Sequence, residues 1–328
     1  MKVALIGLGS VGKGVAEMIA KKDLGLTITG MADSKSGCMD SSGIDIEKVL
    51  AKKRKTGICG DRTITTQDII ERATYDALIE VTPTNALSGE PAIGYIKAAL
   101  ARKKHVVTSN KGPVALAYKE LANMAAKKGV MLRYEATVGG AIPIMHTLEH
   151  GLCGNEILAI YGVLNGTCNY ILTRMAAEGL TYEQALMEAR EMGYAEADPT
   201  YDVKGIDAAI KLVILANTIW GDGVKLGDVD LTGIDLLTPD ALRLAEDEGC
   251  TIRLIAEAIP KKHLLRVSPR IIEKNHPLVV EGTLNAITLE TDMANEITLI
   301  GRGAGSVETA SAIIGDLLYI RNRYGKCA

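Results

Sequence analysis

The glycine-rich segment GLGSVG at residues 7–12 constrains the fold of this chain most strongly, because it follows directly on the apolar run KVALI. A GxGxxG pattern between a strand and a helix forms a tight turn, and it lets the backbone approach a pyrophosphate at the helix N-terminus. An acidic residue, Asp33, ends the next apolar run about 20 residues later, where it can bind a ribose hydroxyl. The segment therefore predicts a dinucleotide-binding unit. The alternative is a glycine turn without a ligand.

Short apolar runs alternate with helical patterns in the first part of the chain. The expected strands are KVALIG, LTITGMAD, ALIEVTP, HVVTSN and VMLRYEA, and the expected helices span residues 10–22, 45–54, 88–102 and 113–128. Pro113 suits the first turn of its helix, and Gly129 suits the end. This alternation predicts βαβ units and a parallel sheet, in a domain of residues 1–134.

The pattern changes after about residue 135. The Gly-rich segment TVGGAIP leads into a helix, the strand EILAIYGVLNG and further helices up to Trp220. Strand-like runs follow between residues 251 and 300, and a final helix covers about 306–322. We therefore expect an α/β protein in which an α+β domain, residues 135–305, follows the dinucleotide-binding domain.

Composition excludes several functional classes. The net charge is −3 and the only basic run is KKRK at residues 52–55, so neither nucleic acid nor a membrane surface is implied as a partner. KKRK is read as a solvated helix end, with a phosphate contact as the alternative. The six cysteines form no CxxC pair, which favours reduced thiols over disulfides or a zinc site. With no signal peptide and no apolar run long enough for a membrane span, we expect a cytoplasmic protein.

A charged pair stands in a segment that otherwise predicts a buried helix. Residues 205–220 read GIDAAIKLVILANTIW, and the only charges are Asp207 and Lys211, which are four residues apart and share one helix face. Buried Asp and Lys are rare unless they are paired. Glu196, Asp198 and Asp202 precede them, so carboxylates and an ammonium are expected to meet near a cleft. The alternative is an exposed helical ion pair.

Residues at the ends of the predicted strands are candidates for the cofactor site. Lys111 follows the run HVVTSN, and ligands of open α/β sheets bind beyond the carboxyl ends of the strands. Lys111 is therefore expected to point towards the nicotinamide, unless it is an ordinary surface lysine. Asp33 favours NAD, whereas Ser34, Lys35 and the KKRK run could hold the 2′-phosphate of NADP, so the cofactor preference stays open.

Two further turns suit anions. NGTCNY at residues 165–170 lies between a strand and a helix, where backbone N–H groups and Thr167 could hold a carboxylate, or where Asn or Thr only caps the helix. Cys168 in this turn is interpreted as a packing residue. GRGAG at residues 301–305 precedes the last helix and is either a second anion-binding turn or a flexible entry to that helix.

Together these segments resemble the homoserine dehydrogenase family. The resemblance rests on GLGSVG at 7–12, TSNK at 108–111, YEATVGGAIP at 134–143, GVLNGTCNYIL at 162–172, GYAEADPTYDVKGIDAAIK at 193–211 and GRGAG at 301–305. It implies a Rossmann domain, a substrate and dimerisation domain, and a final segment, 306–328, that packs back on the first domain. It also implies interconversion of L-homoserine and L-aspartate 4-semialdehyde with NAD(P), in the pathway to threonine and methionine, by a homodimer. Because the sequence ends soon after GRGAG, a monofunctional enzyme without a kinase or regulatory domain is expected.

The resemblance also assigns site residues. It makes Lys111 and Lys211 catalytic, and the substrate residues would be Gly166, Thr167, Tyr194, Glu196, Asp202 and Asp207. The cofactor residues would be Gly7, Gly9, Ser10, Val11, Gly12, Asp33, Thr82, Ser109, Lys111 and Gly303. A monovalent cation such as Na⁺ would bind backbone carbonyls at Glu135, Val138, Gly140 and Ile142. In the chemistry this implies, a lysine with lowered proton affinity accepts the hydroxyl proton while a hydride passes to the nicotinamide.

Two alternatives belong to other functional classes. An aspartate-semialdehyde dehydrogenase would need a thiol nucleophile with a nearby His, and the sequence offers no clear His partner for Cys153 or Cys168. A non-catalytic dinucleotide sensor would have little use for a buried Asp207 and Lys211.

Overall fold

The computed structural model describes residues 1–324, and Cys327, whose redox role the sequence leaves open, lies outside the described residues together with the end of the predicted final segment. The chain divides into two compact units. The first comprises Met1–Thr137 and the segment that starts at Gly305, and the second comprises Val138–Ala304.

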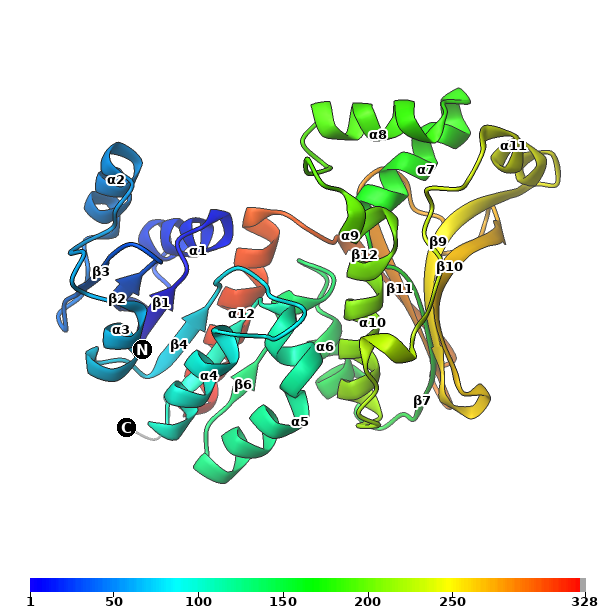
Figure 1. Cartoon of the computed structure of the whole chain (residues 1–328). Helices are drawn as coiled ribbons and strands as arrows, with labels where there is room; N and C mark the ends of the chain where they lie inside the picture. Colours follow the sequence, from blue (N-terminus) through cyan, green and yellow to red (C-terminus); the bar gives the residue numbers. More distant parts are fainter. Residues whose placement is uncertain (325–328) are drawn as a thin grey trace. The chain divides into compact units, whose positions relative to one another are not determined.

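A six-stranded sheet in the order β3-β2-β1-β4-β5-β6 forms the centre of the first unit (Figure 1). Its strands are β1 (Lys2–Ile6), β2 (Thr27–Ala32), β3 (Gly37–Met39), β4 (Ala77–Glu80), β5 (His105–Thr108) and β6 (Leu132–Arg133). All neighbours are parallel except β2 and β3, which pair antiparallel. This is the strand order of a dinucleotide-binding α/β fold, so the predicted Rossmann fold is confirmed. The short antiparallel edge strand β3 was not predicted.

Helices cover both faces of this sheet because its strands are apolar on both sides. Alternate residues of β1 enter different cores: Val3 and Leu5 pack in one, Ala4 and Ile6 in the other. The first core includes side chains of α1 (Ser10–Lys21) and α12 (Ser306–Tyr324). The second includes side chains of α3 (Thr66–Arg72), α4 (Ala92–Ala101) and α5 (Lys111–Lys128). A strand buried on both faces reads as a continuous apolar run, as these do.

The last helix is tied to the first unit by a buried ion pair. Asp316 of α12 is fully buried and accepts hydrogen bonds from Arg133 Nε (2.9 Å) and from the backbone N–H of Glu135 (3.0 Å). The Arg133 guanidinium also lies over the ring of Tyr319, 4.6 Å from its centre. Glu135 begins a 3-10 turn, η1 (Glu135–Thr137), directly after β6. These contacts hold residues near the end of the chain against its sixth strand.

The second unit is built on a six-stranded sheet in the order β12-β11-β7-β9-β10-β8. The strands are β7 (Ile157–Val163), β8 (Asp230–Leu231), β9 (Cys250–Ile259), β10 (Leu264–Glu273), β11 (Leu284–Thr291) and β12 (Glu296–Arg302). Neighbours are antiparallel except β8 and β10. The helices are α6 (Ile144–His146), which continues as η2 (Thr147–Gly151), α7 (Gly166–Glu178), α8 (Tyr182–Glu191), α9 (Thr200–Val203), α10 (Ile206–Ile219) and α11 (Pro239–Asp247), with short turns η3 (Leu226–Asp228) and η4 (Pro260–Lys262).

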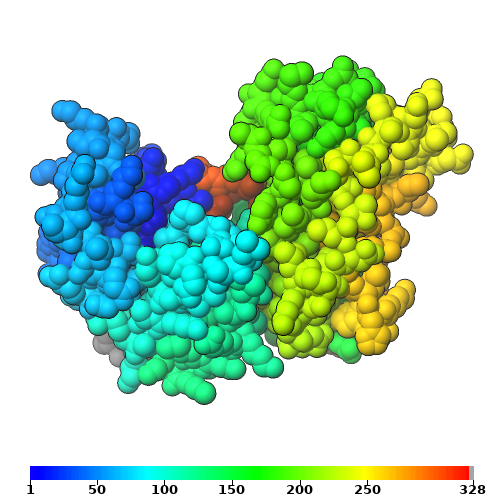
Figure 2. Space-filling view, in the orientation of Figure 1, coloured from blue at the N-terminus to red at the C-terminus, as the bar shows by residue number. Residues whose placement is uncertain are grey.

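The helix α10 is buried, as its sequence predicts. Every residue from Ala208 to Asn217 is buried, and Lys211 is only 6% exposed. In contrast, α8 lies at the surface of this unit (Figure 1, Figure 2), where Met187 is exposed. The interpretation of Asp207 and Lys211 as an exposed ion pair is therefore excluded.

Two local predictions need correction. The helix expected over 88–102 begins only at Ala92, because residues 83–91 form a loop that ends in Pro91. The helix expected over 45–54 extends as α2 (Ile46–Thr56), and three of the four KKRK side chains are exposed, whereas Lys53 turns back towards Asp33. No helix among residues 1–324 is both long and apolar enough to cross a membrane.

We predict that Asp316→Ala lowers the free energy of unfolding by about 3–5 kcal/mol, because it leaves the Arg133 guanidinium buried without that carboxylate. Urea denaturation followed by circular dichroism measures the change. The control is Asp240→Ala, which removes an exposed pair with Arg243 and should change stability by less than about 0.5 kcal/mol. Equal effects of the two substitutions would contradict the role given to Asp316.

Candidate functional site

A cavity of about 700 Å³ opens beside the turn between β1 and α1. It lies where the strand order reverses, between the ends of β1 and β4, which is where open α/β sheets bind their ligands. Predicted cofactor residues that line it are Gly7, Gly9, Ser10, Val11, Asp33 and Thr82, and Lys35 and Lys53 line it as well.

Two glycines of the first turn, Gly7 and Gly12, leave no room for side chains on the protein side. Gly7 has φ +94°, and a Cβ there would lie 2.4 Å from the carbonyl oxygen of Val81. A Cβ on Gly12 would lie 1.9 Å from the carbonyl oxygen of Gly7. Gly9 differs, because a Cβ there would point into open space, and this residue caps α1 without any side-chain hydrogen bond. The N-terminus of α1 is thus exposed to the cavity, in the arrangement that binds a pyrophosphate.

Asp33 and Lys53 form an ion pair in the cavity wall. One carboxylate oxygen of Asp33 pairs with Lys53, and the other accepts the backbone N–H groups of Lys35 (2.8 Å) and Ser36 (3.0 Å). Burial raises the pKa of Asp33, but the hydrogen bonds and the Lys53 charge outweigh it, so the net pKa lies below its usual value. The cavity therefore presents a carboxylate and an ammonium side by side.

A buried carboxylate, Glu80, joins the segment after β4, which lines the cavity, to the end of β5. It is fully buried at the end of β4 and accepts hydrogen bonds from the backbone N–H of Thr82 (2.9 Å), the Thr82 hydroxyl and the Thr108 hydroxyl (2.7 Å). Burial raises the pKa of Glu80, and these hydrogen bonds oppose that shift. The Thr108 hydroxyl in turn accepts the backbone N–H of Asn110 (2.9 Å). One carboxylate thus links the cavity residue Thr82 to the residues before Lys111.

Lys111 is the first residue of α5, and its backbone is fixed from both sides. Asn110 caps the helix by accepting the N–H of Gly112 (3.2 Å), and its Nδ2 donates to the Thr82 carbonyl (3.3 Å). A Cβ on Gly112 would lie 2.5 Å from the carbonyl oxygen of Asn85, so the loop after β4 packs directly on this turn. Ser109, another predicted cofactor residue, is held by its N–H to the Glu80 carbonyl (3.4 Å).

In the second unit, Lys211 is buried among polar partners at the end of β7. Its Nζ lies 2.7 Å from Asp207 Oδ2 and donates to the Leu164 carbonyl oxygen at 2.6 Å. Asp207 is one helical turn earlier on α10, as the four-residue spacing predicts. Its side chain is only 13% exposed. An ammonium and a carboxylate are therefore held together in a largely dehydrated environment.

Asp202 joins this pair through Asn165. The Nδ2 of Asn165 donates to Asp202 Oδ1 (2.6 Å) and to Asp207 Oδ2 (2.9 Å). Burial is the main cause of a raised pKa at Asp202; the Asp207 carboxylate adds to it, while Asn165 and Lys211 oppose it. Three predicted site residues, Asp202, Asp207 and Lys211, are thus brought together by a residue that was not among them.

The other predicted substrate residues lie on the neighbouring loop. The Thr167 hydroxyl donates to the Tyr194 carbonyl (2.9 Å), and the Tyr194 ring packs edge-on against Tyr170. Glu196 is exposed on the same loop, which Arg190 supports through a hydrogen bond to the Ala197 carbonyl (3.1 Å). Gly166 begins α7, where a Cβ would lie 2.7 Å from the Thr283 carbonyl oxygen.

Cys168 and Cys153, the two cysteines considered as nucleophiles, have no contacts that indicate thiol chemistry. Cys168 is fully buried at the start of α7, where its thiol donates to the Asp202 carbonyl (3.1 Å), and burial raises its pKa well above the usual range. The exposed Cys153 directs its thiol at the His150 carbonyl oxygen (3.6 Å). A catalytic thiol needs a lowered pKa and a base. Cys168 is thus a packing residue, as the sequence predicts.

The predicted cation site stays a prediction. It takes Glu135 from the first unit and Val138, Gly140 and Ile142 from the second. No group of three or more His, Cys, Asp or Glu side chains suited to a metal occurs in the described part of the chain, but backbone carbonyls are not tested by this. Gly303, predicted to contact the cofactor, belongs to the second unit, where a Cβ would lie 2.0 Å from Nδ2 of the buried Asn285.

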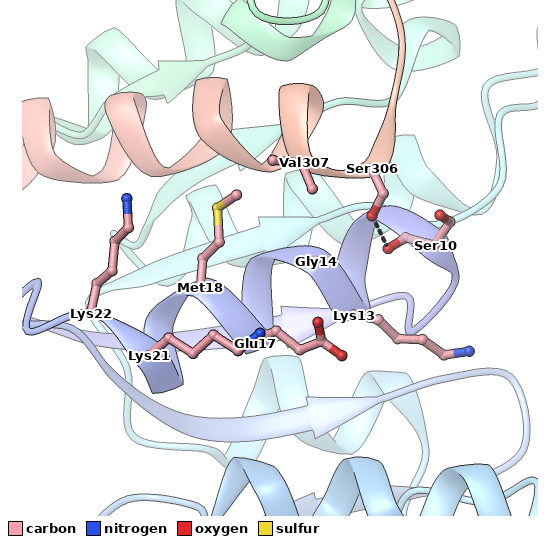
Figure 3. Close-up of a pocket in the computed structure, with 9 residues that line it drawn as sticks. All are labelled: Ser10, Lys13, Gly14, Glu17, Met18, Lys21, Lys22, Ser306 and Val307. Carbon is pink, nitrogen blue, oxygen red and sulfur yellow. Dashed lines mark hydrogen bonds between the residues drawn. The ribbon is translucent and has the colours of Figure 1, made fainter.

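A second cavity, of about 590 Å³, lies beside α1 and the first turn of α12 (Figure 3). Ser306 Oγ donates to the Ser10 carbonyl there (2.7 Å). Its lysines, Lys13, Lys21 and Lys22, are solvent-exposed. Surface lysines of this kind are usually solvated, so we assign no ligand to this cavity.

Sequence reasoning did not single out Lys53, Glu80 or Asn165. Lys53 was hidden in a charge run whose other members are exposed. Glu80 stands at the end of a predicted strand, a position that could have marked it, since acids are rare in buried strands. Asn165 belongs to a motif that was noticed, but its role depends on residues about 40 positions away, as the separations to Asp202 and Asp207 show.

Comparisons with known proteins agree with this architecture. The family model for the homoserine dehydrogenase NAD-binding domain matches residues 7–135, and that for homoserine dehydrogenase matches residues 143–318. Homoserine dehydrogenase of Methanocaldococcus jannaschii is 46% identical, over 98% of this chain and 99% of that protein. The NAD(+)-dependent homoserine dehydrogenase of Pseudomonas canavaninivorans is 35% identical, over 97% of this chain and 96% of its own length. The crystal structure of a putative homoserine dehydrogenase from Archaeoglobus fulgidus superposes with a TM-score of 0.92 at 46% identity, over 98% and 99% of the two chains.

We predict that Gly9→Ala folds normally but binds NAD(P)H at least about tenfold more weakly, because its Cβ enters the space expected for the pyrophosphate. Fluorescence titration gives the dissociation constant, and thermal unfolding gives the stability. Gly154→Ala is the matched control, since a Cβ also has open space there within the described chain. Unchanged affinity in the Gly9 variant would show that the pyrophosphate does not lie in this turn.

Proposed function

The chain belongs to the homoserine dehydrogenase family, and we propose that it interconverts L-homoserine and L-aspartate 4-semialdehyde with NAD(P), as a step towards threonine and methionine. The observation that carries the proposal is the buried Lys211–Asp207 pair with Asp202 beside it. Oxidation of an alcohol requires a base for the hydroxyl proton, and this pair supplies a lysine held in a dry and fixed position.

Lys211 is the proposed acid and base. In the oxidation its amine takes the hydroxyl proton, and in the reduction its ammonium returns that proton to the oxygen. A bound nicotinamide supplies the acceptor or donor of the hydride. Asp207 and the Leu164 carbonyl direct Nζ, which limits the loss of orientation that a flexible lysine would suffer.

Lys111 is proposed as a second cation for the same oxygen. A neighbouring positive charge lowers the affinity of an amine for its proton, and it also stabilises a developing alkoxide. The support is its position at the first turn of α5, where Asn110 and the Glu80 network fix the backbone. Lys111 also follows a parallel strand, and ligands of such sheets bind beyond the carboxyl ends of the strands, which supports a place near the nicotinamide.

The acidic segment is proposed to bind the amino group of the substrate. Asp202, Asp207 and Glu196 carry the negative charge, and the backbone N–H groups of Gly166 and Thr167 at the start of α7 are suited to the substrate carboxylate. Tyr194 would close one side, since its ring is already packed against Tyr170. Binding both ends of the amino acid would leave its hydroxyl for Lys211.

We predict that the wild-type protein reduces NAD⁺ or NADP⁺ with L-homoserine, and that Lys211→Ala lowers kcat by about 10²–10⁴-fold. Cofactor affinity should change by less than about threefold, because Lys211 does not line the cofactor cavity. Absorbance at 340 nm measures turnover, and Lys111→Ala should also lower kcat.

The matched control is Lys204→Ala, which removes a lysine two residues before α10 that pairs with Asp235 (2.7 Å). It should turn over at nearly the wild-type rate. If Lys211→Ala kept its kcat within a few-fold, the catalytic assignment would be wrong. If the folded wild type bound NAD(P)H but did not turn over homoserine, the substrate assignment would fail.

We also propose that the Asp33–Lys53 pair lets the cavity accept both NAD and NADP. Asp33 is suited to a ribose with two free hydroxyls, and Lys53 to a 2′-phosphate. The two side chains contact each other, so each can neutralise the other when only one is needed. The relative named NAD(+)-dependent supports the first half of this proposal.

Lys53→Ala should raise the KM for NADP⁺ at least about tenfold while the KM for NAD⁺ changes less than about threefold, because only NADP⁺ carries the phosphate. Initial rates with each cofactor at saturating homoserine measure this. Lys55→Ala, an exposed lysine of the same helix end, is the control and should alter neither value. Parallel changes for both cofactors would contradict a role in phosphate recognition.

A homodimer is proposed to form through the sheet of the second unit. The helix α9 and the start of α10 pack on the face that carries Leu254 and Val267, whereas Tyr161 and Glu257 project from the other face. Glu257 pairs there with Arg266 (2.6 Å) and Arg270 (3.1 Å). A broad face with paired charges and a tyrosine is suited to a second copy.

A further inference from the structure

The side chain of Asn165 uses both of its N–H donors and its carbonyl oxygen inside the second unit. Its Oδ1 accepts the N–H of Cys168 (2.9 Å), and its two Nδ2 hydrogens serve Asp202 Oδ1 (2.6 Å) and Asp207 Oδ2 (2.9 Å). A primary amide has two N–H donors and one carbonyl oxygen, so this set leaves no donor over. Asn165 is 4% exposed, so water does not easily replace these partners.

These neighbours fix the orientation of the amide. If its oxygen and nitrogen were exchanged, the oxygen would face two carboxylates and the NH₂ group would face the Cys168 N–H. Both arrangements would be repulsive, so the hydrogen-bond network alone determines the orientation. Asn165 also lies directly after Leu164, whose carbonyl accepts Lys211 Nζ. One strand end therefore contacts the carboxylate and the ammonium of the proposed catalytic pair.

The simplest explanation of Asn165 is a helix cap for α7. Asn, Asp and Ser are nearly equivalent in that position, because each offers an oxygen to the N–H groups of the first turn. A cap explains the bond to Cys168 but neither bond to the carboxylates. Asp cannot make those bonds, since it has no N–H to donate, and the Ser hydroxyl has a single hydrogen. Replacing Asn165 by Asp or Ser therefore keeps the helix cap but removes one or both hydrogen bonds to the carboxylates.

The charges around Asn165 show why two donors matter at this point. The titratable groups that meet here are Asp202 of α9, Asp207 and Lys211 of α10, and Cys168 of α7. Two carboxylates repel each other in a largely dehydrated site, and the ammonium of Lys211 is paired with Asp207 and the Leu164 carbonyl. An N–H group to each carboxylate favours the ionised forms without adding a charge.

We propose that Asn165 is a positioning residue that holds Asp202 and Asp207 at a fixed separation and thereby sets the position and proton affinity of Lys211. The inference rests on the function proposed above, since it acts through Lys211. Asn165 orients the Asp207 carboxylate that pairs with Lys211. As the cap of α7 it also fixes the backbone of Thr167, two residues later. The substrate segment and the proposed base thus share one anchor.

The test compares Asn165→Asp and Asn165→Ser with the wild type. Both variants keep a cap for α7, and the neutral Asn165→Ser should keep its melting temperature within about 3 °C of the wild type, whereas the third buried carboxylate of Asn165→Asp should lower it further. For both, kcat for homoserine oxidation should fall at least about tenfold, with NAD(P)H affinity unchanged. In the Asp variant the added carboxylate favours the protonated forms of Asp202 and Lys211, so the acid limb of the kcat profile should move to higher pH.

A role in capping alone would leave kcat within about threefold of the wild type in both variants, and this result would overturn the proposal. If the Asp variant did not fold, the neutral Ser variant alone would test the proposal. A kcat at least about tenfold lower would support it, and a kcat within about threefold of the wild type would overturn it. Thr238→Ala, which removes the cap of α11, is the control for lost capping and should lower the melting temperature without changing kcat.

Lys211→Ala, measured in parallel, separates this inference from the function on which it rests. Loss of turnover in Lys211→Ala together with full turnover in the Asn165 variants would overturn only the positioning role. Full turnover in Lys211→Ala would overturn the catalytic assignment itself, and with it the route by which Asn165 is inferred to act.

Discussion

The arrangement of the second unit depends on keeping a buried ammonium and two carboxylates mutually satisfied. Removing either member of a buried ion pair typically costs about 3–5 kcal/mol, because the remaining charge stays in a medium that solvates it poorly. Lys211 is 6% exposed in a helix whose other faces are apolar, so it cannot turn to water. Its partners must come from the protein, and they come from the end of β7 and from Asp207. The position of α10 therefore depends on the register of β7 and on the start of α7, because Lys211 must reach the Leu164 carbonyl.

Much of the first unit could be predicted because its signals are local. The GxGxxG turn, the alternation of strands and helices, Pro113 in the first turn of α5 and Gly129 at its end depend on backbone geometry within a few residues. The burial of α10 was likewise predicted from the apolar residues on nearly all faces of a single helix. Short elements were missed: β3 pairs with β2, and α3 packs Ile69 and Ile70 into the core, so both depend on contacts with distant strands.

The residues that sequence reasoning missed act over long separations. Lys53 contacts Asp33 from the end of α2, and Glu80 contacts Thr108 across neighbouring strands. Within its own segment neither residue stands out, because Lys53 lies in the basic run KKRK and Glu80 follows the apolar run ALI. Their contacts form only when the sheet brings distant strand ends together, and the hydrophobic periodicity of a segment does not predict which strand ends meet. The motif around Asn165 was visible as either an anion-binding turn or a helix cap, and neither interpretation predicted its bonds to two distant carboxylates.

Asn110 and Asn165 show one structural device used twice. Each follows a strand, caps the next helix with its side-chain oxygen, and turns its amide hydrogens towards a loop or carboxylates needed nearby. Asn suits this position because a single planar group both accepts from the helix N-terminus and donates in the opposite direction, which neither Ser nor Asp can do fully. The residue after Asn110 is Lys111, and the residues after Asn165 are Gly166 and Thr167. In both units some of the proposed functional residues thus lie where a strand end becomes a helix start, next to an Asn that fixes the turn.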